Sequence, residues 1–388
     1  MLLDRRGERR VKDMSVASLQ RWRARMMERP ERWVANDTGG RCPMVDIAAE
    51  GEPPRFTCDL KAIDEKVSGY WRQIWTRVER RRPQLEKLVL DLLPTLQEAP
   101  IEPIVAQDIS RALSSAKGTA GACGWRVAEL KAAQALHGQF ADAFNLMEEA
   151  GVQPDHALQG DVSLVPKAGG APRYDSMRPI TVLSTLHRLY AAIRLRKTLM
   201  PAQERLFGSC PMAACRPTWS TKDLTLPLAL MVELSAWEDP PQTITGASYD
   251  LVKCFDSLPM SISGEGDPIS DTDGVLWKVM ERLGTPKAIL RLMRDQYSHL
   301  VRRFKINGFL GDPVECPATL PGQVPEPGCP RSPHAFRGAA QGCAFSMYAM
   351  NMAAYAWYVL VQKLSLIHIS EPTRPERIGG GGGGVGKK

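Results

Sequence analysis

An α+β fold is the class that the sequence predicts. Apolar residues recur every three or four positions through residues 60–97, and again in a basic segment over residues 187–200, which is typical of amphipathic helices. Short apolar segments joined by polar turns indicate strands instead. In residues 304–311 the pair Asn307-Gly308 marks the turn of a hairpin. An apolar content of 44% in 388 residues is ample for a buried core.

Residues 1–60 are expected to form a basic, loosely ordered arm. Residues 1–36 carry ten Lys or Arg against five Asp or Glu, so they supply +5 of the formal net charge of +7. Such an arm, with Trp22 and Trp33, can hold a nucleic-acid backbone. A solvated helix near residues 15–27 explains the same charges slightly better.

Residues 61–155 are expected to form a helical N-terminal region. The pattern of residues 60–97 restarts after Pro83, and a further helix is expected over residues 105–115. The small-residue segment KGTAGACGW, residues 117–125, reads as an ordinary turn. A long helix follows and ends at Gly151, and it presents one apolar face, formed by Leu136, Phe140, Phe144 and Met147.

A strand hairpin with two cations comes next. The strand VSLVPK ends in Lys167, and the strand RPITVL begins with Arg178. Cations on adjoining strands can converge on one polyanion, and Arg suits bidentate phosphate contact. A surface hairpin with solvated charges fits the same pattern equally well.

Cysteine spacing indicates neither a disulfide framework nor a zinc module. The nine cysteines are dispersed without a Cys-x2-Cys pair, and the six histidines keep no finger-like spacing from them. An intracellular, reducing compartment is the simplest inference. The charged N-terminal segment MLLDRRGERR also lacks the apolar core of a secretory signal.

Residues 338–362 carry no charged residue and are long enough to cross a bilayer as a helix. The polar Gln341, Ser346 and Asn351, together with small and Met residues, favour a helix buried in a protein core. We therefore expect no membrane partner.

The segment SYDLVKCFDSL, residues 248–258, carries the chemistry. Asp250 ends a short apolar strand, and Phe255 and Asp256 follow five and six residues later. Nucleotidyl transfer uses carboxylates clustered around divalent ions, so an acid at a strand end beside a large aromatic has a chemical use. Taken alone, this segment is better explained by a strand-to-helix turn with a capping acid.

Five segments occur in one order over residues 100–363: ISRALSSAKGTAGACGWRVAEL; LVPK with RPITVLSTLHRLYAAIRLR; SYDLVKCFDSL; FKINGFLGD; and RGAAQGCAFSMYAMN. In this order the chain resembles the fingers and palm of a reverse transcriptase, most closely that of non-LTR, LINE-like retrotransposons. The resemblance implies a right-hand polymerase fold. It also implies RNA template, DNA primer and deoxynucleoside triphosphates as partners.

The resemblance also implies roles for particular residues. Asp250 matches the first metal-binding aspartate, and the carbonyl of Leu251 would be a further Mg²⁺ ligand. Phe255 matches the aromatic that rejects the ribose 2′-hydroxyl. The fingers cations that hold the triphosphate correspond to Lys167 and Arg178, and the loop against template and nucleotide to Gln341 and Gly342. Asp256 resembles an acid that fixes the motif, and Asn351 a polar contact to the palm.

The second catalytic motif of the family, an aromatic-x-Asp-Asp hairpin, is not present, because no two Asp residues are adjacent in the sequence. After Lys363 the chain instead reads LSLIHISEPTRPE and then six glycines, which resembles a translated sequencing adapter. We expect residues 156–363 to form incomplete fingers and palm, and residues 364–388 a non-native, disordered tail. With Asp250 as its motif carboxylate, the fragment should bind Mg²⁺ weakly and be inactive. A nucleic-acid-binding remnant without catalysis is the alternative.

Overall fold

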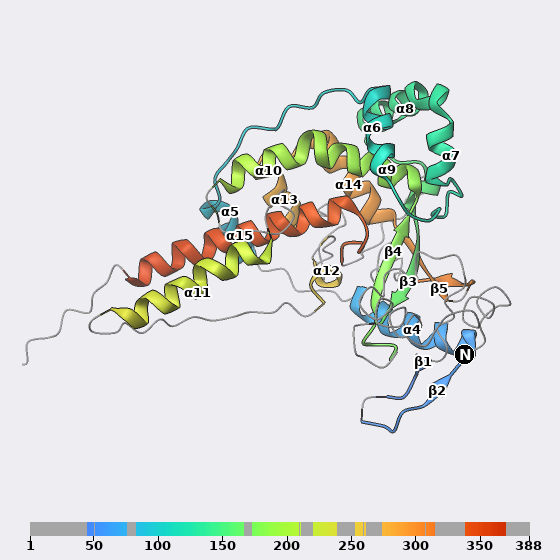
Figure 1. The fold of residues 1–388 in the computed structure, drawn as a ribbon, viewed down its shortest axis with the longest axis horizontal. Helices are drawn as coiled ribbons and strands as arrows, with labels where there is room; N and C mark the ends of the chain where they lie inside the picture. Colours follow the sequence, from blue (N-terminus) through green and yellow to red (C-terminus); the bar gives the residue numbers. More distant parts are fainter. Residues whose placement is uncertain are drawn as a thin grey trace, which may run out of the picture.

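The structure is a computed structural model that describes residues 45–49, 51–75, 83–166, 173–208, 210, 220–238, 253–258, 260, 274–306, 308–314 and 338–369. These residues form helices and small sheets, in agreement with the predicted α+β class (Figure 1). The helix expected near residues 15–27 lies outside the described residues.

The main sheet of the described part has the strand order β4-β3-β5-β6. Its strands are β3 (Gln159–Val165), β4 (Arg178–Leu183), β5 (Val301–Ile306) and β6 (Phe309–Pro313). Two antiparallel hairpins, β3 with β4 and β5 with β6, join through the parallel pair β3 and β5. Both hairpins were predicted from the sequence, and Gly308 has the positive φ of 86° that the second turn needs. A two-stranded sheet pairs β1 (Val45–Asp46) with β2 (Phe56–Thr57).

Helix α4 (Leu60–Trp75) packs against the main sheet and shares a core with it. Trp71 and Trp75 lie with Val162 of β3 and Phe304 of β5, and the Trp75 and Phe304 rings stack at 5.7 Å. Figure 1 shows α4 beside β3 and β5. The sequence instead predicts that α4 belongs to a separate helical region, residues 61–155. The domain boundaries remain predictions. The boundary predicted between residues 155 and 156 separates α4 from β3 and β5, but side chains of all three elements share this core.

Most of the remaining helices form a second, larger core, in which Tyr190, Met280, Leu292 and Phe345 are buried. The elements in chain order are α5 (Pro83–Leu92), α6 (Ala106–Ser115), α7 (Val127–Ala132), the 3₁₀ turn Gln134–Leu136, α8 (His137–Ala150), the 3₁₀ turn Asp155–Leu158, α9 (Thr185–Arg194), the π-helical turn Leu195–Leu199, α10 (Met200–Phe207), α11 (Thr221–Trp237), α12 (Cys254–Ser257), α13 (Val275–Arg282), α14 (Lys287–His299) and α15 (Ala344–Ile369).

The start of α8 differs from its prediction. Phe144 is buried as expected, and Gly151 ends the helix in the left-handed region with a φ of 71°. Leu136, however, lies in the preceding 3₁₀ turn and is exposed. His137 is buried in its place, and its Nε2 lies 3.0 Å from the carbonyl oxygen of Leu130. The helix begins one residue later than the apolar pattern indicates, so Leu136 leaves the buried face.

Helix α15 begins at Ala344, because residues 338–343 form a turn. Its first turns are buried, with Phe345, Tyr348 and Met352 in the larger core, as expected for a core helix. Farther along, Trp357 is 55% exposed. The helix continues to Ile369, past the expected start of the tail. No helix in the described part of the chain is both long and apolar enough to cross a membrane.

A buried histidine connects α9 to its neighbours. His187 Nδ1 lies 2.8 Å from Gln153 Oε1, and its Nε2 lies 3.5 Å from Cys343 Sγ. Since the Gln153 amide nitrogen already donates to the Leu292 carbonyl, its oxygen faces His187, which places the imidazole proton on Nδ1. Burial, with the nearby charge of Arg188, lowers the pKa of His187 from 6.5 to about 4.

This pKa predicts a loss of stability in mild acid. The unfolded chain binds a proton at this histidine near pH 6.5, whereas the folded protein binds it only near pH 4. The contribution is therefore fully present above pH 6.5 and falls by about 3 kcal/mol as the pH is lowered through this window. Urea unfolding of the wild type and of His187→Gln at several pH values between 4 and 7 measures it. For each protein the free energy of unfolding is plotted against pH, and the difference between the two slopes is the readout. Equal slopes for the wild type and His187→Gln would contradict the prediction.

Candidate functional site

Asp256 of α12 is the centre of the candidate site. The segment is short: Lys253 adopts a left-handed conformation with a φ of 50°, and α12 follows it directly. The Asp256 side chain is buried, and each of its oxygens accepts a hydrogen bond. Trp75 Nε1 donates to Oδ1 over 3.0 Å, and Gln341 Nε2 donates to Oδ2 over 2.6 Å. The carboxylate thus joins α4, α12 and the turn before α15.

Arg302 of β5 supplies the positive charge. Arg302, Phe304 and Ile306 occupy the buried positions of this strand, so the arginine faces the protein interior. Its Nη2 donates to the Gly338 carbonyl oxygen over 2.8 Å, and its guanidinium lies 4.4 Å from the centre of the Trp75 ring. The cation therefore contacts the same aromatic side chain that donates to Asp256.

Burial shifts the pKa values of Asp256 and Arg302 in opposite directions. Burial raises the pKa of Asp256, while the hydrogen bond from Trp75, the charge of Arg302 and the hydrogen bond from Gln341 act against this rise. Burial lowers the pKa of Arg302 to about 10, against the attraction of Asp256. Both oxygens of Asp256 are occupied by protein donors. The role that the resemblance implies for Asp256, an acid that fixes the motif, stays a prediction.

Two glycines let the turn of residues 338–343 pack closely on both sides. Gly338 has a φ of 85°, and a Cβ there would lie 2.7 Å from the Asp256 carbonyl oxygen. Gly342 has a φ of 117°, and a Cβ there would lie 2.7 Å from the Thr181 carbonyl oxygen. Thr181 N–H also donates to the Gln341 carbonyl oxygen over 2.7 Å. The turn thereby attaches α12 to the outer edge of β4.

Lys253 attaches α12 to α4 from the other side. Its ammonium lies 4.5 Å from the centre of the Tyr70 ring and 4.3 Å from that of Trp71, and it donates to the Asp175 carbonyl oxygen over 3.1 Å. Burial lowers the pKa of Lys253. A left-handed residue other than glycine costs about 1 kcal/mol. The cation–π contacts offset that cost.

The predicted site residues fall into two groups. Arg178 begins β4 and is exposed, opposite Val165 of β3. Phe255 packs against the larger core, and its carbonyl oxygen accepts from Ala339 N–H over 2.8 Å. With Gln341 and Gly342, these residues lie on elements joined through Thr181 and Asp256. The others, Lys167, Asp250 and Leu251, lie outside the described residues.

No protein-family model matches this chain, and no curated protein matches it either. The chain's own residues therefore carry the argument for a function. Among the residues that the structure describes, no group of three or more His, Cys, Asp or Glu side chains could hold a metal ion. The predicted magnesium ligands are not among those residues, so the Mg²⁺ prediction remains a prediction.

The sequence does not predict the roles of Trp75 and Arg302, and for Asn351 it predicts only a polar contact to the palm. Asn351 Nδ2 donates to Gln203 Oε1 of α10 over 2.9 Å. A signal for Arg302 existed, because it is a charge at an inward position of an alternating strand and needs a buried partner. Trp75 gave no such signal, since its place on the buried face of α4 is equally typical of a core residue.

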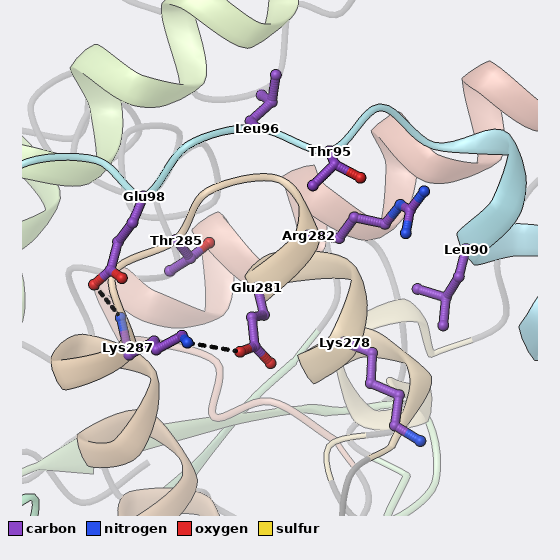
Figure 2. A pocket seen from close by; sticks show the side chains of 9 residues that line it. All are labelled: Leu90, Thr95, Leu96, Glu98, Lys278, Glu281, Arg282, Thr285 and Lys287. Carbon is purple, nitrogen blue, oxygen red and sulfur yellow. Dashed lines mark hydrogen bonds and ion pairs between the residues drawn. The ribbon is translucent and has the colours of Figure 1, made fainter.

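A groove of about 460 Å³ lies elsewhere on the surface, between the segment after α5 and the start of α14 (Figure 2). Three of its charged residues, Glu98, Glu281 and Lys287, interact with one another. Glu98 accepts from Lys287 N–H over 2.9 Å, and Lys287 Nζ lies 3.8 Å from Glu281. None of the residues around Asp256 lines this groove. We assign it no function.

Proposed function

We propose that this chain is a fragment of the RNA-directed DNA polymerase of a non-LTR retrotransposon, with right-hand fingers and a partial palm. The parent protein would add deoxynucleotides to a DNA primer on an RNA template by two-metal nucleotidyl transfer with Mg²⁺. Because the chain has no adjacent Asp pair, it should itself transfer nucleotides negligibly.

One observation carries the proposal: three of the five family-like segments meet around Asp256. The first segment, which forms β4, contributes Thr181, a residue of the strand that Arg178 begins. The second segment contributes Phe255 and Asp256, and the third contributes the Gln341 turn, which contacts both of the others. The segments are far apart in sequence. Among the residues that meet, the resemblance assigns roles to Phe255, Asp256, Gln341 and Gly342 but not to Thr181.

The arrangement also supports a division of roles. Asp256, Trp75 and Arg302 form an interior cluster, in which Trp75 and Gln341 donate to the Asp256 carboxylate and Arg302 donates to the Gly338 carbonyl oxygen. Arg178 is exposed and can contact a phosphate. In the proposal, Asp250 and the Leu251 carbonyl hold Mg²⁺, Lys167 and Arg178 hold the triphosphate, and Phe255 excludes ribonucleotides.

The test begins with the source nucleic acid downstream of the Lys363 codon. If the reading frame continues into an aromatic-x-Asp-Asp motif, the extended protein should elongate a DNA primer on an RNA template with Mg²⁺. Asp250→Asn should lower the rate more than about a hundredfold, because a bound metal ion contributes several kcal/mol to such a reaction. Phe255→Val should raise ribonucleotide incorporation while deoxynucleotide incorporation continues.

Two results would overturn the proposal. One is an extended protein that carries the motif, folds and binds primer–template, yet shows no Mg²⁺-dependent elongation. The other is an unchanged rate in Asp250→Asn. If the tail proves genuine and the chain binds RNA or DNA in a salt-dependent manner without elongation, the non-catalytic remnant replaces the polymerase.

A further inference from the structure

Cys123 lies at the N-terminus of α9, in the loop between α6 and α7. The N–H of Thr185 donates to its sulfur over 3.3 Å. Thr185 is the first residue of α9, and the preceding residue, Ser184, makes no side-chain cap of its own. The sulfur therefore takes the place of a capping acceptor, where the helix dipole and free backbone N–H groups favour a negative charge.

Arg188 brings a formal positive charge to the same place. It lies one turn into α9, donates to Thr185 Oγ1 over 3.0 Å and to the Thr119 carbonyl oxygen of the loop, and its charge interacts with the Cys123 thiol. From the loop and α7, the charged residues are Arg126 and Glu129, and Glu129 Oε2 accepts a hydrogen bond from the backbone N–H of Arg126 over 2.8 Å. The net electrostatic effect at the sulfur therefore favours an anion.

Ser184 provides an independent indication that an anion belongs at this place. The residue is fully buried, and its Oγ has no hydrogen-bond partner within the described part of the protein. The hydroxyl lies beside the Cys123 sulfur, in a geometry that falls short of a regular hydrogen bond. A buried hydroxyl without an acceptor is costly. An ionised sulfur, which attracts a donor more strongly than a thiol does, would satisfy it.

The acidity of Cys123 agrees with this geometry. Burial raises the pKa of the thiol, but the Ser184 hydroxyl and the backbone N–H groups of Trp125, Thr185 and Leu186 outweigh it and leave the pKa below the ordinary value. We regard the backbone groups as the stronger contributors, because the Thr185 bond has regular geometry and the Ser184 contact does not. The Cys123 residue is intermediate between buried and exposed, so part of it faces solvent.

We propose that Cys123 is a modification site whose thiolate exchanges with low-molecular-weight disulfides. In this step the Cys123 sulfur attacks one sulfur of the disulfide, a new S–S bond forms to the protein, and the other half leaves as a thiolate. The step needs no oxidant beyond the disulfide itself. It is independent of the proposed polymerase activity.

Modification would disturb the loop and the start of α9. The sulfur would become neutral and would no longer attract the Thr185 N–H and Arg188 as an anion does. The loop has little room to adjust, since a Cβ at Gly121 would lie 2.2 Å from the Leu183 carbonyl oxygen. Because Leu183 ends β4, the modification would act at the strand that also carries Arg178.

The test compares Cys123 in the folded chain with Cys123 in a synthetic peptide of residues 118–128, which has the same local sequence without α9. An aromatic disulfide is added at pH 6 to 9, and peptide mass mapping gives the rate at Cys123. Steric access multiplies the rate by a factor that does not depend on pH, whereas thiolate formation does. The ratio of the protein rate to the peptide rate should therefore rise severalfold from pH 9 to pH 6.

Arg188→Gln is the matched variant, and circular dichroism establishes that it is folded. Its rate ratio should rise less steeply toward low pH than that of the wild type. A ratio in the wild-type protein that is flat with pH, or that falls toward pH 6, would overturn the proposal. So would a Cys123 that does not react in the folded chain at any pH.

Discussion

Arg194→Met is expected to destabilise the protein by about 3–5 kcal/mol, because it leaves a buried carboxylate without its cation. Arg194 and Glu148 form an ion pair between α9 and α8, and the arginine side chain is fully buried. Its Nε donates to Glu148 Oε1 and its Nη2 to Glu148 Oε2, which is the bidentate geometry that suits a guanidinium. Urea unfolding followed by circular dichroism measures the loss.

Arg194 and Glu148 also make hydrogen bonds to neighbouring groups. Tyr190 donates to Glu148 Oε1 over 2.8 Å, and burial raises the pKa of Tyr190 well above its ordinary value, so the tyrosine stays a donor. Arg194 Nη1 also donates to the Glu102 carbonyl oxygen over 2.8 Å. Removing the arginine therefore leaves the Glu148 carboxylate without its cation and the Glu102 carbonyl without this donor.

The control for Arg194→Met is the double variant Arg194→Met/Glu148→Leu, which removes both charges. Replacing a buried ion pair by apolar residues is often close to neutral, so the double variant should be more stable than Arg194→Met alone. Equal destabilisation of the two variants would contradict the argument. The cost would then come from lost packing rather than from an uncompensated charge.

Local patterns in the sequence predict most of the individual elements. Asn307-Gly308 marks the β5–β6 turn, and Gly151 ends α8 as the pattern indicates. Each of these signals acts within a few residues, since turn and cap conformations depend on the local backbone. The register of a helix is less certain, and the exposed Leu136 shows an error of one residue at the start of α8.

The candidate site is harder to predict because its contacts are long-range. Trp75 and Asp256 are 181 residues apart, and the helical pattern of α4 tells which of its faces is buried but not what covers that face. Gly338 and Gly342 gave a partial signal, since glycines often mark close approaches. Only the fold reveals that these approaches are to Asp256 and Thr181.

Asp256→Asn is expected to cost about 3–5 kcal/mol of stability, since it removes the buried negative charge that attracts the guanidinium of Arg302. The asparagine also offers one acceptor where the carboxylate offers two, so the Trp75 or the Gln341 donor loses its bond. Trp75→Phe is the matched control. It retains an aromatic ring against Phe304 and removes one hydrogen bond to a charged group, for an expected cost of about 1.5–3 kcal/mol.

A double-mutant cycle separates these contributions. Once Trp75→Phe has removed the tryptophan donor, Asp256→Asn should lower the free energy of unfolding by less than it does in the wild type. Urea midpoints of the four proteins give the coupling free energy, which should be at least about 1 kcal/mol. Additive losses, or an Asp256→Asn protein as stable as the wild type, would contradict the prediction. Asp256 joins α4, α12 and the Gln341 turn. A strong coupling would therefore mean that α4 helps to stabilise the candidate site.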